Sequence, residues 1–511
     1  MGLDIVLIKR IKRIAIFLAA ALVITNLGSF TSALASEVDG KKITSMGAIV
    51  IDFETGMEIY AYNADTRRGP ASMTKMMTVY LVYEAIANGL IDFDTLVPIS
   101  QYVYNYSRTP GETNVPLMMN IQYTVDELLD VIVVMSAGGA CAALAELIAG
   151  TTRAFYRLMN AKAEEWGIDA VFYSVSGGVD YTQMTPRAMA TITRNMLLDY
   201  PEVLEKTSMS TVNFRGRVIP STNLLLGVYE GIDGFKTGTH PGTRANFSGT
   251  AKRGDIRIIS VTMGSSSSGR FPDTTILLDY GFAVMEAYWQ AIEARKVDPE
   301  SLTVVINGDE VDFESYRVEG YSYINIRDIA YIFNGTKAQF DVGWDYEEDA
   351  LILTSDMQYT AIGGEMAGRG GERRLPEPLG VTVLLDGEEL ELVAYDIEGE
   401  NYFQISDIMT ALGFLVVWKW DGSAHVISIS TGDEPPPEEI EEPPPLVPVR
   451  PPLYVPPEPA EPEPGEQEPP AKEADTENTQ PVPLPIVFGV FGGLCGFGAI
   501  VALIKRGRAR G

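Results

Sequence analysis

The sequence contains few of the residues that build metal centres and disulfide frameworks. Its 511 residues include only two cysteines, Cys141 and Cys495, and two histidines, His240 and His425. Two cysteines exclude a framework of several disulfides, and we expect each to be a small buried residue. Two histidines cannot supply a zinc site of several imidazoles, and a Ser-His-Asp triad would have to use one of them. We therefore predict no metal and no other cofactor.

Positive charge is scarce as well. There are 39 lysines and arginines against 69 aspartates and glutamates, which gives a formal net charge of −30. A chain with this charge is repelled by nucleic-acid phosphates, so a DNA or RNA partner is not expected. The chain is nevertheless 46% hydrophobic, and at this length it can bury a substantial core and form two to four domains.

Both ends of the chain carry membrane signals. Basic residues before position 14, an apolar stretch over 14–24 and Ala33-Leu34-Ala35 predict a signal peptide over residues 1–35, with an uncleaved anchor as the alternative. Apolar residues 484–504 precede a basic tail, 505–511, which predicts a transmembrane helix with a cytoplasmic C-terminus rather than a buried core helix. Residues 433–483 are a Pro/Glu-rich linker that cannot form a core. The folded part is thus expected outside the cell membrane.

Residues 36–295 show the pattern of a mixed α+β domain. A strand over 47–52, a turn at Glu54-Thr55-Gly56 and a returning strand over 57–60 predict an antiparallel hairpin, and a further, alternating strand is predicted over 256–263. Apolar residues at helical spacing follow Ser72. The pattern indicates helices combined with an antiparallel sheet.

The segment Ser72-Met73-Thr74-Lys75 places a serine at a helix start and a lysine one turn later. Residues three apart share a helix face, so Lys75 can reach the Ser72 hydroxyl. An uncharged lysine amine can accept the serine proton, provided that burial and a second nearby cation lower its pKa. Ser-x-x-Lys alone is weak evidence, because a chain of this length contains about one copy by chance.

Two downstream segments strengthen the case. Ser136 follows in Met135-Ser136-Ala137-Gly138, and Lys236-Thr237-Gly238 adds a second lysine, a hydroxyl and a glycine where backbone can approach a ligand closely. A lysine and a hydroxyl beside glycine suit a substrate with a free carboxylate. Serine β-lactamases and penicillin-binding proteins show this order of motifs.

Between about residues 45 and 282, the chain resembles the D-alanyl-D-alanine carboxypeptidases of the low-molecular-mass penicillin-binding class. The matching stretches include VIDFETGMEIYAYNADTRRGPASMTKMMT, YTVDELLDVIVVMSAGGACAALAE, STNLLLGVYEGIDGFKTG and RFPDTTILLDYGF. The resemblance implies a β-lactamase/transpeptidase-like fold. It also implies peptidoglycan stem peptides as substrates and β-lactams as covalent inhibitors.

The resemblance also assigns roles to residues. Ser72 would attack the peptide carbonyl, Lys75 would be the general base, and Ser136 would relay a proton to the departing D-alanine. Lys236 and Thr237, beside Gly238, would hold the substrate carboxylate. The backbone N–H groups of Ser72 and Thr239 would form the oxyanion hole.

The chain departs from the family pattern at two places. The family has Asn, usually followed by Asp, where this chain has Gly138 and Gly139. Loss of the asparagine hydrogen bond costs ~1–3 kcal/mol, a rate loss of roughly 5- to 200-fold. Thr243-Arg244-Ala245 replaces Ala-Gly-aromatic; Arg244 either adds a cation for the carboxylate or is solvated, the interpretation we favour, and we place His240 at the rim of the site.

Residues 301–358 and 380–432 form an internal repeat, because VEGYSYINIRDIAYIFN over 318–334 aligns with IEGENYFQISDIMTALG over 397–413. Each copy predicts a strand with an Asn-Gly or Asp-Gly turn and a short helix, hence two small α+β domains. They resemble repeats named after the N-terminal domain of copper amine oxidases, although one histidine, His425, is no copper site. We interpret their tryptophans and tyrosines as core residues, with binding of wall polymer as the alternative.

The favoured function is a serine carboxypeptidase that removes the terminal D-alanine from stem peptides. The alternatives are a weakly active homologue that binds wall peptides or positions partners, a serine β-lactamase, and a structural surface protein. The β-lactamase is disfavoured because no deacylating glutamate motif is recognisable.

Overall fold

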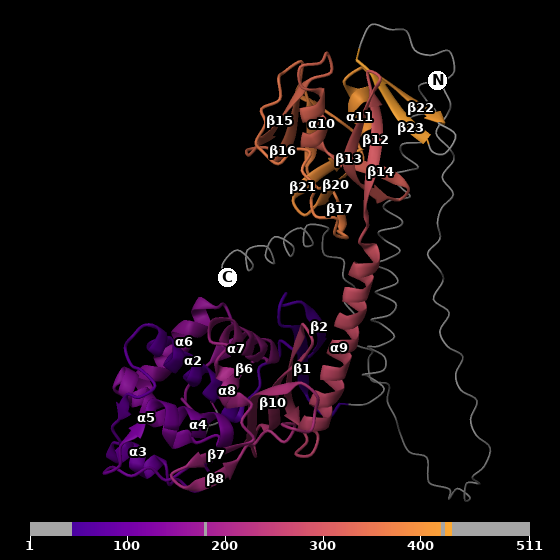
Figure 1. Cartoon of the computed structure of the whole chain (residues 1–511). Helices are drawn as coiled ribbons and strands as arrows, with labels where there is room; N and C mark the ends of the chain where they lie inside the picture. Colours follow the sequence, from indigo (N-terminus) through magenta and orange to yellow (C-terminus); the bar gives the residue numbers. More distant parts are fainter. Residues whose placement is uncertain (1–42, 178–180, 421–424, 432–511) are drawn as a thin grey trace, which may run out of the picture. The chain divides into compact units, whose positions relative to one another are not determined.

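The computed structural model describes residues 43–177, 181–420 and 425–431. The signal peptide, linker, transmembrane helix and basic tail predicted from the sequence lie outside these residues. The chain divides into two compact units, residues 1–290 and 291–511 (Figure 1). Within the described ranges, no helix is both long and apolar enough to span a bilayer.

The first unit is built on a five-stranded antiparallel sheet in the order β2-β1-β11-β10-β9. The bounds of its strands are β1 Gly47–Asp52, β2 Glu58–Tyr62, β9 Ile232–His240, β10 Arg244–Arg253 and β11 Ile256–Ser265. The predicted hairpin at 47–60 and the predicted strand at 256–263 are confirmed as β1-β2 and β11.

Both faces of this sheet are covered, which explains why every residue of β1 is buried. Ile49 and Ile51 point into a core shared with a group of helices, whereas Ala48 and Val50 pack against α9, Arg270–Arg295. Alternate residues of one strand therefore enter two different cores. The other helices are η1 Ala71–Thr74, α2 Lys75–Ala87, α3 Gln101–Tyr106, α4 Val125–Met135, α5 Gly138–Ala149, α6 Thr152–Glu165, α7 Pro186–Asp199 and α8 Val203–Thr207.

Three two-stranded hairpins complete the first unit. They pair β3 Leu96–Val97 with β4 Tyr123–Thr124, β5 Ala170–Val171 with β6 Gln183–Met184, and β7 Thr211–Phe214 with β8 Arg217–Pro220.

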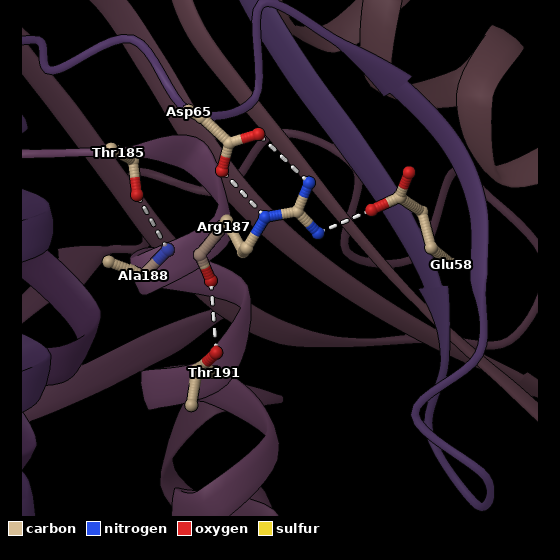
Figure 2. Close-up of polar contacts among 6 residues, drawn as sticks. All are labelled: Glu58, Asp65, Thr185, Arg187, Ala188 and Thr191. Carbon is tan, nitrogen blue, oxygen red and sulfur yellow. Dashed lines mark hydrogen bonds and ion pairs between the residues drawn. The ribbon is translucent and has the colours of Figure 1, made fainter. Parts of the chain in front are cut away.

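An arginine in the first turn of α7 fixes the chain between β2 and η1 (Figure 2). The Arg187 guanidinium donates two hydrogen bonds to Asp65, at 2.7 and 3.1 Å, and a third to Glu58 of β2. The hydrogen bonds from Arg187 lower the pKa of the Asp65 carboxyl. The backbone N–H of Arg187 also donates to Ala64 O at 3.1 Å. Side chain and backbone together anchor the segment that leads to Ser72.

In the second unit the strands of the two sequence repeats are shared between one eight-stranded and one four-stranded sheet. The strands are β12 Pro299–Ile306, β13 Asp309–Val318, β14 Tyr321–Asn325, β15 Phe340–Asp345, β16 Ala350–Ser355, β17 Pro376–Pro378, β18 Thr382–Leu385, β19 Glu388–Glu389, β20 Ala394–Ile397, β21 Glu400–Phe403, β22 Leu415–Trp420 and β23 His425–Ser430. The helices are α10 Ile326–Phe333 and α11 Ile405–Ala411.

This sharing differs from the two separate repeat domains that the sequence predicts. Strand β12 of the first repeat pairs in parallel with β23 of the second, and β16 of the first pairs with β18 of the second. Both repeat helices contribute to one core, in which Phe333 and Met409 are fully buried. A pair of short hairpins with one helix buries too little apolar surface alone, so the two repeats share one core.

The local features predicted for the repeats are present. The turns at Asn307-Gly308 and Asp386-Gly387 join β12 to β13 and β18 to β19. Trp344 packs against the shared core, and Tyr316 and Tyr402 are buried in a neighbouring cluster, which agrees with their interpretation as core residues. The side chains of Trp418, Trp420 and His425 lie outside the described part of the structure.

Candidate active site

Ser72 lies in η1, a short 3-10 helix that is followed at once by α2. Ala71 has φ of 50°, in the left-handed region that residues with a Cβ seldom occupy. Two glycines allow other backbone to press against this turn. A Cβ at Gly177 would lie 2.0 Å from Ala71 O, and one at Gly238 would lie 2.4 Å from Pro70 O. Gly177 and Gly238 therefore pack closely against the backbone just before Ser72, and neither position has room for a side chain.

Lys75 lies in the first turn of α2 and points at this serine. Its Nζ donates to Ser72 Oγ at 2.8 Å and to the carbonyl oxygen of Ser176 at 2.7 Å. The side chain is buried, and burial lowers the pKa of Lys75 below its usual value. The spacing in the sequence predicts the contact with Ser72. The contact with Ser176, 101 residues later in the chain, is not predicted by any sequence motif.

Lys236 of β9 is a second buried lysine in the same unit. Its Nζ donates to Thr237 O at 3.1 Å. Burial lowers the pKa of Lys236 well below its usual value, and the charges of Lys75 and Arg270 lower it further. The charge of Lys75 thus lowers the pKa of Lys236, whereas the lowered pKa of Lys75 itself is due to burial. The second cation that the sequence predicts to lower the pKa of Lys75 is not among its causes.

The strand that carries Lys236 is held by hydroxyl groups and by an arginine. Thr237 Oγ1 donates to Thr222 Oγ1 at 2.7 Å. Arg270, the first residue of α9, donates to Thr239 Oγ1 at 2.5 Å and to Gly238 O at 3.3 Å. The sequence does not predict Arg270 as a site residue. The only signal for it is its place at the start of the RFPDTT stretch that resembles the family. The arginine beside Lys-Thr-Gly is thus Arg270.

Arg244 and His240 flank the turn between β9 and β10. Arg244 is exposed, as the solvated interpretation predicts, and its φ is 60°. His240 is half-buried, and its Nδ1 accepts a hydrogen bond from Gly242 N at 3.2 Å. Both residues help to shape a turn.

Ser136 stands between α4 and α5. It adopts a left-handed conformation with φ of 75° and ends α4. Its Oγ is buried, and no hydrogen-bond partner for it is present among the described residues. Cys141, one turn into α5, is fully buried, and burial raises the pKa of its thiol to about 11. The cysteine is a core residue, as predicted, whereas Cys495 lies outside the described residues.

The two glycines after Ala137 have different surroundings. A Cβ at Gly138 would meet no atom closer than 3.5 Å, which is ordinary contact. A Cβ at Gly139 would lie 2.7 Å from Ser107 Cβ and 2.9 Å from Ser107 Cα. Position 139 therefore requires glycine because the end of α3 packs against it, whereas position 138 has room for a larger residue.

Metal-binding groups are not clustered in the part of the chain that the structure describes. No group of three or more histidine, cysteine, aspartate or glutamate side chains is placed to hold an ion there.

Comparison with known proteins identifies relatives of the first unit. The family model described as D-alanyl-D-alanine carboxypeptidase matches residues 33–267. The carboxypeptidase DacA of Haemophilus influenzae is 30% identical over 297 residues, which cover 57% of this chain and 74% of that protein. The carboxypeptidase DacF of Bacillus subtilis is 29% identical over 283 residues, covering 53% and 72%.

Solved structures give similar matches. Penicillin-binding protein D2 from Listeria monocytogenes, in its ampicillin-bound form, is 31% identical with a TM-score of 0.43, and the match covers 47% of this chain and 98% of that one. The penicillin-binding protein 6B from Escherichia coli is 27% identical with a TM-score of 0.46, and the match covers 54% and 84%.

Proposed function

The chain belongs to the D-alanyl-D-alanine carboxypeptidase family and is a serine hydrolase, and from this premise we propose that Ser72 is the residue it acylates. One observation carries the assignment: Lys75 Nζ lies 2.8 Å from Ser72 Oγ and is buried, with a lowered pKa. A buried amine of lowered pKa loses its proton more readily than an ordinary lysine, and the uncharged amine can then accept the proton of the serine.

The proposed reaction has two halves. Ser72 Oγ attacks the carbonyl carbon of the D-alanyl-D-alanine bond while its proton passes to Lys75 Nζ. The tetrahedral intermediate collapses, the C–N bond breaks, and the departing D-alanine amine takes up a proton relayed through Ser136. Water then attacks the ester carbonyl, the bond between that carbon and Ser72 Oγ breaks, and Ser72 Oγ regains a proton from the water as the shortened peptide leaves. β-Lactams acylate the same serine and are covalent inhibitors.

The strand β9 would bind the end of the substrate. We assign the terminal carboxylate to Lys236 and Thr237, beside Gly238, and add Arg270 as a third positive or donor group. The backbone N–H groups of Ser72 and Thr239 would stabilise the oxyanion. Support for this arrangement is the charge pattern. Lys236 and the Thr237 hydroxyl are neighbours on β9, Arg270 of α9 donates to Gly238 and Thr239 of the same strand, and cations beside a hydroxyl suit a carboxylate.

Labelling with a fluorescent penicillin tests the proposed nucleophile. We expect wild-type protein to acquire a covalent label and Ser72→Ala to acquire none. Absence of label on the wild type, or equal label on the variant, contradicts the proposal. Hydrolysis of nitrocefin is measured in parallel, because rapid turnover would favour a serine β-lactamase instead.

A second candidate is a homologue that binds wall peptides but turns over slowly. Gly138, in place of the family's asparagine, is the observation that favours it. Release of D-alanine by wild type and by Gly138→Asn separates the two. Rapid release by wild type excludes the second candidate, and slow release that rises strongly in Gly138→Asn supports it.

We also propose that the enzyme acts on the outer side of the cytoplasmic membrane. The supporting pattern is in the sequence: the signal peptide predicted over 1–35, the Pro/Glu-rich linker at 433–483 and the apolar segment at 484–504 with its basic tail. Protease added to intact cells should remove residues 36–432 from the membrane fraction. A protected protein would contradict this location.

A further inference from the structure

The position of the missing asparagine is open on its side-chain side. Gly138 is the first residue of α5, and a Cβ there would lie 3.5 Å from Tyr106 Oη and 3.5 Å from Ser176 Cβ. These are ordinary contacts, so sterics do not impose glycine at 138. A side chain at 138 would project toward two hydroxyl-bearing residues and toward Asn114 Oδ1, which would lie 3.6 Å from the Cβ and already accepts from Gly139 N.

These two hydroxyls are bonded to each other and are linked to the catalytic lysine. Tyr106 Oη lies 2.7 Å from Ser176 Oγ, and the carbonyl oxygen of Ser176 accepts from Lys75 Nζ at 2.7 Å. Ser176 is fully buried, and Tyr106 is half-buried. Ser176 thus contacts Lys75 through its carbonyl oxygen and Tyr106 through its hydroxyl, which connects the hydroxyl pair to the amine that would activate Ser72.

The hydroxyl pair has one hydrogen available for a further hydrogen bond. Two hydroxyl groups carry two hydrogens, and the bond between them uses one. When Ser176 Oγ donates to Tyr106 Oη, the hydrogen of the Tyr106 hydroxyl is the one left to donate. The nearest further hydroxyl is Ser174 Oγ at 3.4 Å, which already accepts from the N–H groups of Ser176 and Gly177 at 3.1 Å each. Burial raises the pKa of Tyr106, which keeps the phenol protonated and able to donate at neutral pH.

Tyr106 is held in position by contacts to its backbone and to its ring. Asn114 Nδ2 donates to Tyr106 O at 3.2 Å, while Asn114 Oδ1 accepts from Gly139 N at 2.5 Å. The Tyr106 ring stacks on Tyr102, with centroids 5.9 Å apart and planes inclined by 6°. The amide of Asn114 thus ties the end of α3 to the first turn of α5, and the Tyr106 hydroxyl is held against position 138.

We propose that the Tyr106–Ser176 hydroxyl pair performs the task of the missing asparagine amide, donating a hydrogen bond to a peptide carbonyl oxygen of the bound stem peptide next to the scissile bond. The inference rests on the proposed function. It makes Tyr106 a specificity-determining residue of the same site and explains how the chain retains substrate orientation without an amide at 138.

Removal of one oxygen atom tests the inference. Tyr106→Phe keeps the ring that stacks on Tyr102 and deletes only the hydroxyl. We expect kcat/KM for D-alanine release to fall roughly tenfold, the effect of one lost hydrogen bond. Tyr102→Phe is the matched control: its ring lies on the same helix, it is exposed, and the variant should stay within twofold of wild type. Equal rates for Tyr106→Phe and wild type would overturn the inference.

Rescue distinguishes substrate binding from a merely structural role. Placing an asparagine at 138 in the Tyr106→Phe background should restore most of the lost kcat/KM, because the family's amide then returns to an open position. Ser176→Ala, which keeps the carbonyl bonded to Lys75, should show a loss similar to Tyr106→Phe. A double variant that remains as slow as Tyr106→Phe, with an unchanged melting temperature, would overturn the inference.

The same assays separate this inference from the proposed function. Penicillin labelling of wild type at Ser72 is measured first, and its absence rejects the proposed function. Normal labelling and D-alanine release by wild type, with no effect of Tyr106→Phe, reject only the role of the hydroxyl pair.

Discussion

The helix starts at α2 and α5 carry two of the site's three motifs, and they are built in opposite ways. At α2, the chemistry is local: Ser72 and Lys75 are three residues apart and their side chains touch at 2.8 Å. At α5, the motif lacks the family's amide, and the polar residues around position 138 are Tyr106, Ser176 and Asn114. A motif can thus be recognised from the sequence where its interacting residues share one helical turn. Where residues from distant segments take the place of a missing side chain, the site can be recognised only from the structure.

The largest expected effect is at the start of α2, where the interacting residues are close in the sequence. Lys75→Ala removes the base, and we expect kcat for D-alanine release to fall about 10²- to 10⁴-fold. Circular dichroism and thermal unfolding check that the variant folds. A loss below tenfold would show that another group accepts the Ser72 proton, and the contrast between the two helix starts would then fail.

The next prediction sharpens the contrast between Gly138 and Gly139. Gly139→Ala forces a Cβ to within 2.7 Å of Ser107 Cβ, and we expect it to destabilise the first unit by ~1–3 kcal/mol. Gly138→Ala is the matched control, because its Cβ meets only ordinary contacts and alanine favours helix. Urea unfolding of both variants gives the two free energies of unfolding. Equal stabilities would contradict the close packing of α3 on α5.

The smallest effect is the pH dependence of the wild type. Lys75 acts as a base only when uncharged, and its pKa lies below the usual lysine value. As pH falls through that lowered pKa, Lys75 gains a proton and kcat/KM should fall about tenfold per unit. Above it, kcat/KM should level off well before pH ~10.4, the ordinary lysine pKa. A rate that keeps rising tenfold per unit to that pH would contradict the lowered pKa.

Much of the first unit is predictable because its signals are local. The strands β1 and β2, the turn between them and the strand at 256–263 are each predicted from neighbouring residues, and all are confirmed. The Ser72–Lys75 contact follows from helical spacing alone. Ser176, Tyr106 and Arg270 could not be found in this way, because each reaches the site through a contact with residues about 30 or more positions away.

In the second unit, too, local features can be predicted from the sequence but strand pairing between distant segments cannot. The two repeats are visible in the sequence, and their turns and helices occur at the matched positions. Nothing in either copy indicates that β23 pairs with β12 or that β18 pairs with β16. Strand partners depend on which edges meet as the core forms, and the alternation of apolar residues is the same for either choice.

Mass spectrometry of the penicillin adduct tests the central claim most directly. Protein incubated with penicillin, digested and analysed by peptide mass should carry the penicilloyl group on the peptide that contains Ser72, and Ser72→Ala should carry none. Modification of a peptide that lacks Ser72, or an unmodified wild type that still releases D-alanine, would contradict the assignment of Ser72 as the nucleophile.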